Sequence, residues 1–461
     1  MTGLTGHNRL SIMLHLHFDK GTLLLKGQVG TPYGKWDPRV ECYRIKAHHY
    51  RDVLDYLHQS KQQIRDDVAE LPPLEQFQGS IKLRDYQAEA ADKWHKAGNR
   101  GVLVLPTAAG KTFIALKAIQ KLKVQTLIVV PTLDLIDQWR RRIKENLNVE
   151  AGVVGGGEKN LRMVTVATYD SACIHAEKLG NKFMLIIFDE VHHLASTGYM
   201  QIAEMYIAPY RMGLTATYER TDQRESLLPQ LIGDLVYSVD IKDLAGEHLS
   251  PYTYEKIAVE LTPPEQEAYN SQIEIFKKFL QERRISLRSA ADFQKFIMTT
   301  GRDPKAREAL LARNKAMKVA LNSEAKLAVL AKQLEFYNNE KIIIFTLYND
   351  LVYRISHRFL VPAITHHTPR KERREILSNF ESGAYPVVVT SQVLDEGVDV
   401  PDASVGVILG GTGSNREYVQ RLGRLLRKKD EKLARLIEII SKETMEVATS
   451  RRRHRKIGGN S

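Results

Sequence analysis

The residues at positions 105–112 have the types and order of a phosphate-binding loop. They read Leu-Pro-Thr-Ala-Ala-Gly-Lys-Thr, follow the apolar run 101–105 and precede a helix-like segment at 113–119. A bent loop of small residues lets backbone N–H groups converge on phosphate oxygens. In such a loop Lys111 reaches the β- and γ-phosphates of ATP, and the Thr112 hydroxyl holds Mg²⁺. The residues expected around the phosphates are Thr107, Ala108, Ala109, Gly110, Lys111 and Thr112.

Position 105 is leucine where the general phosphate-loop pattern has glycine, so the loop assignment needs independent evidence. Two adjacent carboxylates, Asp189 and Glu190, provide it. They end the apolar run 185–188, which is typical of a buried strand. Asp189 is placed to complete the Mg²⁺ shell, and Glu190 to orient or deprotonate the attacking water. The alternative is a buried strand that ends in a solvated acidic turn. The upstream loop favours the catalytic interpretation.

Composition excludes several classes of protein and points to a polyanionic partner. No apolar run approaches the ~18 residues of a membrane span, and Cys42 and Cys173 share no Cys-x-x-Cys spacing, which indicates a reducing compartment without a disulfide framework. Of the net charge of +12, residues 277–320 contribute twelve Lys/Arg against four Asp/Glu, and residues 450–461 contribute five with no acid. Basic charge gathered in two places indicates contact with a polyanion. A solvated helix face, and a tail without a role, are the alternatives.

The order of apolar segments predicts three structural parts. Residues 10–46 alternate apolar and polar side chains, which indicates a small β-rich unit, followed by an amphipathic helix at 49–63. Buried strands are expected at 101–105, 126–130, 162–167, 184–188 and 211–214, and a second set at 341–345, 387–390 and 405–409. Buried strands with intervening helices predict parallel, doubly wound sheets. Residues 263–335 between the two sets are expected to be helical.

With two sheets, a phosphate loop and an acidic pair in place, the chain resembles superfamily 2 helicases, and within them the XPB group, especially its short archaeal forms. The resemblance runs from about residue 80 to 435. It implies an α/β fold with two RecA-like doubly wound domains, at 79–245 and 246–461, and a helical thumb insertion at about 263–335. A small N-terminal α+β domain, 1–78, falls where the family has a damage-recognition domain.

The remaining ATP-site residues follow from this resemblance. Leu-Arg-Asp-Tyr-Gln at 83–87 is similar to the adenine-reading motif, in which the Gln87 amide pairs with the adenine edge. Residues 390–401 and 420–427 resemble motifs V and VI. Arg424 and Arg427 would be arginine fingers from the second domain, stabilising charge at the γ-phosphate when the domains close. The resemblance also assigns ATP contacts to Arg84, Gly397, Asp399 and Gln420.

The DNA contacts also follow from the resemblance. Thr132 in motif Ia, Thr168 in the next motif and Thr390 in motif V would meet the DNA backbone. Arg220, Thr221 and Asp222 stand where the family often carries Arg-Glu-Asp, a charged element implicated in opening the duplex. Thr221 replaces the acidic residue. The thumb would place its cations on phosphates. These are Lys277, Lys278, Arg283 and Arg284; the interleaved Phe276, Phe279, Phe293 and Phe296 are expected to be mainly core.

The resemblance predicts an ATP- and Mg²⁺-dependent, 3′ to 5′ DNA helicase or translocase in nucleotide excision repair or transcription-associated DNA opening. Its partners would be duplex, forked or damaged DNA and a nuclease, with no membrane, as a monomer or a heterodimer in a prokaryotic, archaeal cytoplasm. Two alternatives stay open. One is a duplex translocase that never separates strands, which Thr221 makes credible. The other is an ATP-switched DNA clamp that positions a partner nuclease.

Overall fold

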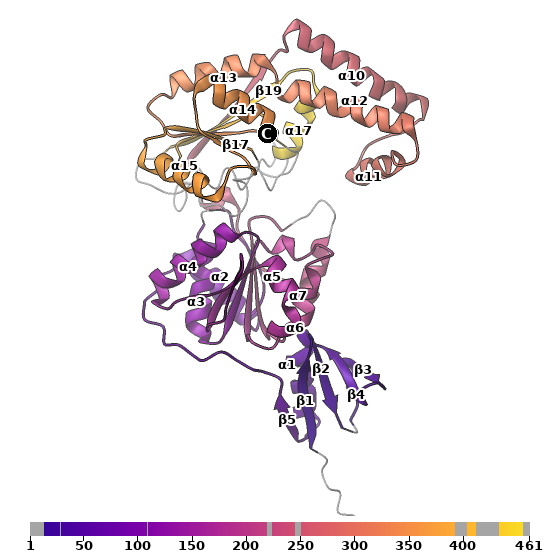
Figure 1. Cartoon of the computed structure of the whole chain (residues 1–461), viewed down its shortest axis with the longest axis vertical. Helices are drawn as coiled ribbons and strands as arrows, with labels where there is room; N and C mark the ends of the chain where they lie inside the picture. Colours follow the sequence, from indigo (N-terminus) through magenta and orange to yellow (C-terminus); the bar gives the residue numbers. More distant parts are fainter. Residues whose placement is uncertain are drawn as a thin grey trace, which may run out of the picture. The chain divides into compact units, whose positions relative to one another are not determined.

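The computed structural model describes residues 13–27, 29–107, 109–218, 224–244, 250–391, 403–411 and 433–454 (Figure 1). The described residues form two compact units, one up to residue 105 together with 110–239, the other 106–109 together with 240 onward. Within the described part of the chain, no helix combines the length and apolar character needed to cross a membrane.

The N-terminal part of the first unit is a small five-stranded sheet with one helix. Its strands are β1 Leu14–Asp19, β2 Thr22–Lys26, β3 Gly34–Asp37, β4 Cys42–Lys46 and β5 Ile64–Asp67, in the order β3-β4-β2-β1-β5. The pairs are antiparallel except β1 with β5. Alternate residues such as Leu14 and Leu16 pack against Val53 and Leu57 of α1 Tyr50–Gln59. The predicted β-rich unit is therefore confirmed, and its helix is shorter than 49–63.

Side-chain contacts join this small sheet to the following domain within the first unit. Ile207, from beyond the small sheet, belongs to the same buried apolar cluster as Leu14 and Leu16. Lys46 Nζ lies 2.7 Å from Glu204 Oε1, and Asn181 Nδ2 donates to the Val68 carbonyl at 3.0 Å. The two sheets of this unit thus share packed contacts in addition to the connecting chain.

The larger sheet of the first unit has eight strands in the order β13-β6-β12-β11-β7-β10-β8-β9. The bounds are β6 Arg100–Val104, β7 Thr126–Val130, β8 Gly152–Gly155, β9 Glu158–Asn160, β10 Val164–Thr168, β11 Leu185–Asp189, β12 Tyr210–Thr215 and β13 Leu235–Ser238. All pairs are parallel except β8 with β9. β7 and β11 are buried at every position, as expected when helices cover both faces.

The helices of this domain lie on the two faces of the sheet (Figure 1). One face carries α2 Asp85–Lys96, α3 Lys111–Leu122 and α4 Leu133–Leu147; the other carries α5 Tyr169–Ile174, α6 Ala176–Leu179 and α7 Met200–Met205. The shorter elements are η1 Ala47–His49, η2 Val191–His193, η3 Arg224–Leu227 and α8 Leu228–Leu231. The predicted strands of this domain are confirmed, and β8, β9 and β13 were not predicted.

The second unit contains a six-stranded parallel sheet in the order β14-β19-β18-β15-β17-β16. The bounds are β14 Tyr252–Val259, β15 Ile342–Phe345, β16 Ala363–Ile364, β17 Val387–Thr390, β18 Val405–Ile408 and β19 Ala434–Ser441. Its helices are α9 Ile241–Leu244, α13 Glu324–Phe336, α14 Asn349–Phe359, α15 Arg370–Ser382 and α17 Met445–His454. The three predicted strands are present, and the prediction of two doubly wound parallel sheets is confirmed.

The helical segment between β14 and β15 has a core of its own. It contains α10 Pro263–Glu282, α11 Ala290–Thr299 and α12 Pro304–Leu321. Phe276, Phe279 and Phe296 are buried against alanines of α12, with Phe293 partly buried beside them. α13, which follows, instead contributes Leu327 and Leu330 to the core of the second sheet. The prediction that these phenylalanines are mainly core is confirmed.

Candidate active site

The phosphate loop connects β6 to α3 and ends in a residue whose backbone conformation favours glycine. Gly110 is the N-terminal cap of α3 and has φ 75°. A side chain there would be strained, and its Cβ would overlap Nε2 of Gln87. The bend places the N-terminus of α3 directly after the loop, and a helix N-terminus is a favourable position for a phosphate group. This is the backbone arrangement that a phosphate group needs.

Lys111, the first residue of α3, lies folded back over the loop. Its Nζ donates to the Leu105 carbonyl at 3.0 Å. Its charge also lowers the pKa of Asp189, against a larger effect of burial that raises the pKa of this carboxyl. The lysine and the carboxylate predicted to hold Mg²⁺ are therefore close enough to interact electrostatically. Thr112 follows in the first turn of α3.

Asp189 ends β11 and is held at both carboxylate oxygens. Trp139 Nε1 donates to Oδ2 at 2.9 Å, and the backbone N–H of Glu190 donates to Oδ1 at 3.1 Å. The hydroxyl of Tyr169 donates to the Asp189 carbonyl at 3.0 Å. Trp139 is 1% exposed and Asp189 is 8% exposed. The carboxylate orientation is thus fixed by Trp139 of α4 and by the following backbone N–H, while Tyr169 of α5 holds the main chain of Asp189.

Glu190 begins a short chain of contacts that reaches β12. Its backbone has φ 49°, a left-handed conformation that costs energy for a non-glycine residue and recurs at functional sites. Its Oε2 lies 3.6 Å from Nδ1 of His192, and the same nitrogen lies 3.3 Å from the Thr215 hydroxyl. Thr215 in turn donates to the Thr217 carbonyl at 2.9 Å. The acidic pair and the Gly-Leu-Thr-Ala-Thr segment at 213–217 are therefore physically connected.

Gln87 lies beside the phosphate loop in the first turn of α2. The side chain is 4% exposed, and its Oε1 accepts the N–H of Arg84 at 3.0 Å. Its Nε2 is the atom that a Cβ at Gly110 would overlap. The structure thus brings the predicted adenine-reading residue against the predicted phosphate loop, although 23 positions separate the two in the sequence.

Thr132 and Thr168 occupy equivalent places at the ends of neighbouring strands. Thr132 caps α4 after β7, where its hydroxyl accepts the Leu135 N–H at 3.4 Å; Thr168 caps α5 after β10, where its hydroxyl accepts the Ser171 N–H at 3.2 Å. Thr168 pairs with Val130 in the parallel register of β10 with β7. Both threonines therefore lie at the carboxyl edge of the sheet that also carries Asp189, the edge at which ligands bind in open α/β sheets.

The predicted DNA-binding residues of the second unit differ in setting. Lys277 and Lys278 are exposed on α10, on the side away from the buried phenylalanines. Arg283 and Arg284 follow the helix and are also exposed, and Arg283 pairs with Asp303 at 3.2 Å. Thr390 ends β17, is fully buried and donates to the Ser391 carbonyl at 2.9 Å. A buried hydroxyl would need local rearrangement to contact DNA.

Several predicted site residues lie outside the described part of the chain, and their roles stay predictions. They are Ala108, Arg220, Thr221, Asp222, Gly397, Asp399, Gln420, Arg424 and Arg427.

Two residues that contact Asp189 were not predicted from the sequence, and both are far from it along the chain. Trp139 is the last residue of the stretch similar to motif Ia, residues 130–139, and was assigned no role of its own, yet it bonds to a carboxylate 50 positions away. Tyr169 was likewise given none, although its hydroxyl reaches the Asp189 carbonyl. The one available signal was that a tryptophan on the apolar face of a predicted helix needs a partner for its indole N–H.

The residues present fit ATP and Mg²⁺. The N-terminus of α3 suits a polyphosphate, because Gly110 leaves open the space that a Cβ would occupy. The Thr107 hydroxyl has no hydrogen-bond partner among the described residues. A buried carboxylate and a threonine hydroxyl in the first turn of α3 are oxygen ligands of the kind that Mg²⁺ prefers.

Comparison with known proteins places this site in a class. Family models match at residues 80–220 (Type III restriction enzyme, res subunit), 325–429 (Helicase conserved C-terminal domain) and 16–68 (Xeroderma pigmentosum group B helicase damage recognition domain). The crystal structure of the Pyrococcus furiosus Hef helicase domain shares the fold, with a TM-score of 0.53 and 20% identity over 80% of this chain and 98% of that one. Fold and site thus define a helicase-type ATPase.

Relatives narrow the class to a family. The DNA 3′-5′ translocase XPB2 of Sulfurisphaera tokodaii is 46% identical over 96% of this chain and 100% of that protein. The DNA 3′-5′ helicase XPB of Kineococcus radiotolerans is 30% identical over 78% of this chain and 60% of its own length, and that of Mycobacterium tuberculosis is 28% identical over 84% and 65%. The chain belongs to the XPB group of superfamily 2 DNA helicases and translocases.

Proposed function

We propose that this chain hydrolyses ATP to move 3′ to 5′ on DNA and to open the duplex, in nucleotide excision repair or in transcription-associated DNA opening. The observation that carries the proposal is the hydrogen bond from Trp139 to Asp189. It joins the helix capped by Thr132, predicted to meet DNA, to the carboxylate predicted to serve ATP. A DNA-dependent ATPase needs such a link between its two sites.

The residues support a specific division of labour during hydrolysis. Lys111 would exchange the Leu105 carbonyl for a phosphate oxygen of ATP. Asp189 and Thr112 would hold Mg²⁺, which neutralises charge on the phosphates when bound. Glu190 would orient the attacking water and accept its proton, with His192 beside the carboxylate at 3.6 Å and Thr215 holding His192. Arg424 and Arg427 would complete the site from the second domain.

The DNA path and the partners belong to the same proposal. Thr132 and Thr168 lie at one sheet edge, where backbone N–H groups of capped helices suit phosphate contact. The exposed cations of α10 suit phosphates in the same way.

As implied by the resemblance, an endonuclease partner and a cytoplasmic, archaeal setting are part of the proposal, with the chain monomeric or paired with that nuclease. Affinity capture from the source cells that recovers no nuclease would count against the partner.

A translocase that never separates strands is the second candidate, favoured by Thr221. The two are distinguished by measuring ATP turnover and strand displacement together on a forked DNA, with Lys111→Ala as the inactive control. Turnover with displacement establishes a helicase. DNA-stimulated turnover without displacement, combined with ATP-driven removal of a third strand from a triplex, establishes the translocase. Turnover that survives Lys111→Ala would remove the assignment of the phosphate loop.

A further inference from the structure

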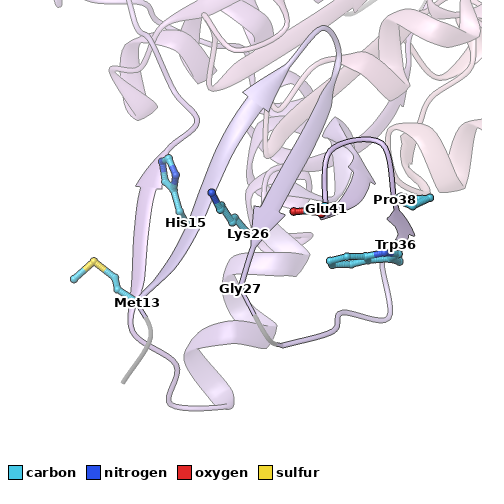
Figure 2. A pocket seen from close by; sticks show the side chains of 7 residues that line it. All are labelled: Met13, His15, Lys26, Gly27, Trp36, Pro38 and Glu41. Carbon is cyan, nitrogen blue, oxygen red and sulfur yellow. The ribbon is translucent and has the colours of Figure 1, made fainter. Parts of the chain in front are cut away.

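The first unit contains a pocket and a buried aromatic group that the ATP and DNA assignments leave without a role. The pocket, of about 530 Å³, opens at one end of the N-terminal sheet, with Lys26, Trp36 and Glu41 in its lining (Figure 2). Because a lysine and a glutamate both line it, its charge selects neither an anionic nor a cationic ligand. The aromatic group lies in the larger sheet beside Glu190, and each of its contacts has a defined partner.

Glu190 has a backbone conformation that its surroundings must maintain. Its φ of 49° and ψ of 56° are left-handed, a conformation that glycine adopts freely and that costs energy for a residue with a side chain. Such a conformation persists where the surrounding structure holds it. The backbone torsions of a residue also set the direction in which its side chain leaves the chain. The direction of the carboxylate predicted to accept a proton from water therefore depends on the contacts that maintain this turn.

Tyr169, the first residue of α5, contacts both peptide groups that flank Glu190. Its hydroxyl donates to the Asp189 carbonyl at 3.0 Å and lies 3.4 Å from the Glu190 carbonyl. These two carbonyls belong to the peptide groups before and after the Glu190 Cα, so the φ and ψ of Glu190 set their relative placement. The Glu190 carbonyl also accepts the N–H of His193 at 3.0 Å. A hydroxyl that reaches both carbonyls thus restrains both torsions of the turn.

The side chain of Tyr169 is itself held in place. It is 2% exposed, and its ring centroid lies 5.2 Å from that of Tyr199 and 5.7 Å from that of His193. The Tyr199 hydroxyl donates to Asp170 Oδ1 at 2.6 Å, so the segment after the acidic pair is bonded to α5 beside Tyr169. The Tyr169 hydroxyl is therefore directed inward, although Thr168 next to it is predicted to contact DNA.

We propose that Tyr169 is a positioning residue for ATP hydrolysis, whose hydroxyl maintains the left-handed turn that directs the Glu190 carboxylate to the attacking water. Tyr169 touches neither ATP nor DNA in this role and acts through the main chain of Asp189 and Glu190. Without the hydroxyl, the turn relaxes toward a commoner backbone conformation and the carboxylate moves away from the water. The inference rests on the proposed function and adds a residue on which its chemical step depends.

Tyr169→Phe tests the proposal, because it keeps the ring and removes the hydroxyl. DNA-stimulated ATP turnover is measured over a range of ATP concentrations, and DNA affinity by fluorescence anisotropy. We expect kcat to fall about tenfold, with the KM for ATP and the DNA affinity within about twofold of the unmodified chain. The matched control is Tyr206→Phe, which removes a fully buried hydroxyl that donates to the Ala172 carbonyl of the same helix at 2.8 Å. That variant should lose thermal stability and keep its kcat.

A second measurement separates positioning of Glu190 from general stability. Tyr169→Phe is added to Glu190→Gln, and the single-turnover rates of hydrolysis are compared. If Tyr169 acts through Glu190, the second change lowers the remaining rate by less than about twofold, because the group that it positions is already lost. A merely structural role would instead give a further loss of about tenfold, as in the single variant.

Four results would overturn the proposal. They are a further tenfold loss in the double variant, an equal loss of kcat in Tyr206→Phe, an unchanged kcat in Tyr169→Phe, and a fall in DNA affinity without a fall in kcat. The last of these would assign the tyrosine to DNA contact. Absence of DNA-stimulated turnover in the unmodified chain is a separate result, which removes the proposed function and this inference with it.

Discussion

The indole nitrogen of Trp139 lies 2.9 Å from Oδ2 of Asp189, and this bond connects α4 to the end of β11. Both side chains are buried. The residue predicted to contact DNA at the start of α4 and the residue predicted to hold Mg²⁺ are thus linked through one helix and one hydrogen bond.

Trp139→Phe tests this link, because it keeps an aromatic ring in the core while it removes the N–H together with part of the indole. We expect ATP turnover to fall about tenfold, as for loss of a hydrogen bond to a charged group, with a raised Mg²⁺ requirement and unchanged DNA affinity. The matched control is Trp94→Phe, whose buried N–H donates to the Arg211 carbonyl at 2.9 Å. A similar rise in Mg²⁺ requirement in both variants would show that Trp139 acts only through stability.

Gly110→Ala should weaken ATP binding, because the new Cβ displaces the Gln87 amide from the loop and the backbone is left-handed. Gly98→Ala is the control, since Gly98 has φ 73° but no neighbouring atom within 4 Å of the place where its new methyl group would lie. Both variants should lose about 1 kcal/mol of stability from backbone strain. Nucleotide binding, measured with a fluorescent ATP analogue, should be weakened only in the first. Normal binding in Gly110→Ala would rule out the tight loop.

Glu190→Gln should stop ATP hydrolysis while preserving ATP binding, because the amide cannot accept the proton of the attacking water. The residue is also close to His192, so thermal unfolding serves as a check that the fold survives. Trapping of uncleaved nucleotide by filter binding is the measurement. Turnover within threefold of the unmodified chain would exclude Glu190 as the base.

Arg427→Ala should spare ATP binding and lower turnover by at least about a hundredfold, the effect expected when an arginine finger is removed. This prediction rests on the sequence, since Arg427 lies outside the described residues. Arg435→Ala, a change in the described strand β19, is the control for loss of an arginine in the same unit. A loss of turnover no larger than in that control would contradict the finger role.

His48 should make the first unit less stable in acid. Burial, followed by the charges of His49 and Arg211, lowers the pKa of His48 to about 3. The unfolded chain therefore binds a proton below about pH 6.5 that the folded chain does not, and stability falls as the pH drops from there toward 4. His48→Gln should flatten this part of the melting-temperature profile. His58→Gln, at an exposed position of α1, should leave the profile unchanged.

Local patterns made much of the fold predictable. β7 and β11 are apolar throughout because helices cover both faces, and that pattern is visible in the sequence. β14 was missed because it is an edge strand with mostly exposed side chains, and such a strand has no continuous apolar run.

In the active site, too, features with a local sequence pattern were predictable and features without one were not. The phosphate loop and the acidic pair are each contained within a few consecutive residues, so residue types alone identified them. The capping threonines were assigned through the family resemblance. The bonds from Trp139 and Tyr169 to Asp189 depend on which strands and helices become neighbours, and no local pattern carries that information.

The shared packing between the N-terminal sheet and the next domain has a mechanical consequence. Ile207 is buried with Leu14 and Leu16, and Lys46 is paired with Glu204, so the small sheet is fastened to its neighbour by side chains. A force exerted on the small sheet by a strand of DNA would be transmitted through these contacts to the larger sheet that carries Asp189. The small sheet and the larger sheet would then move as one body, and loss of these contacts would uncouple them.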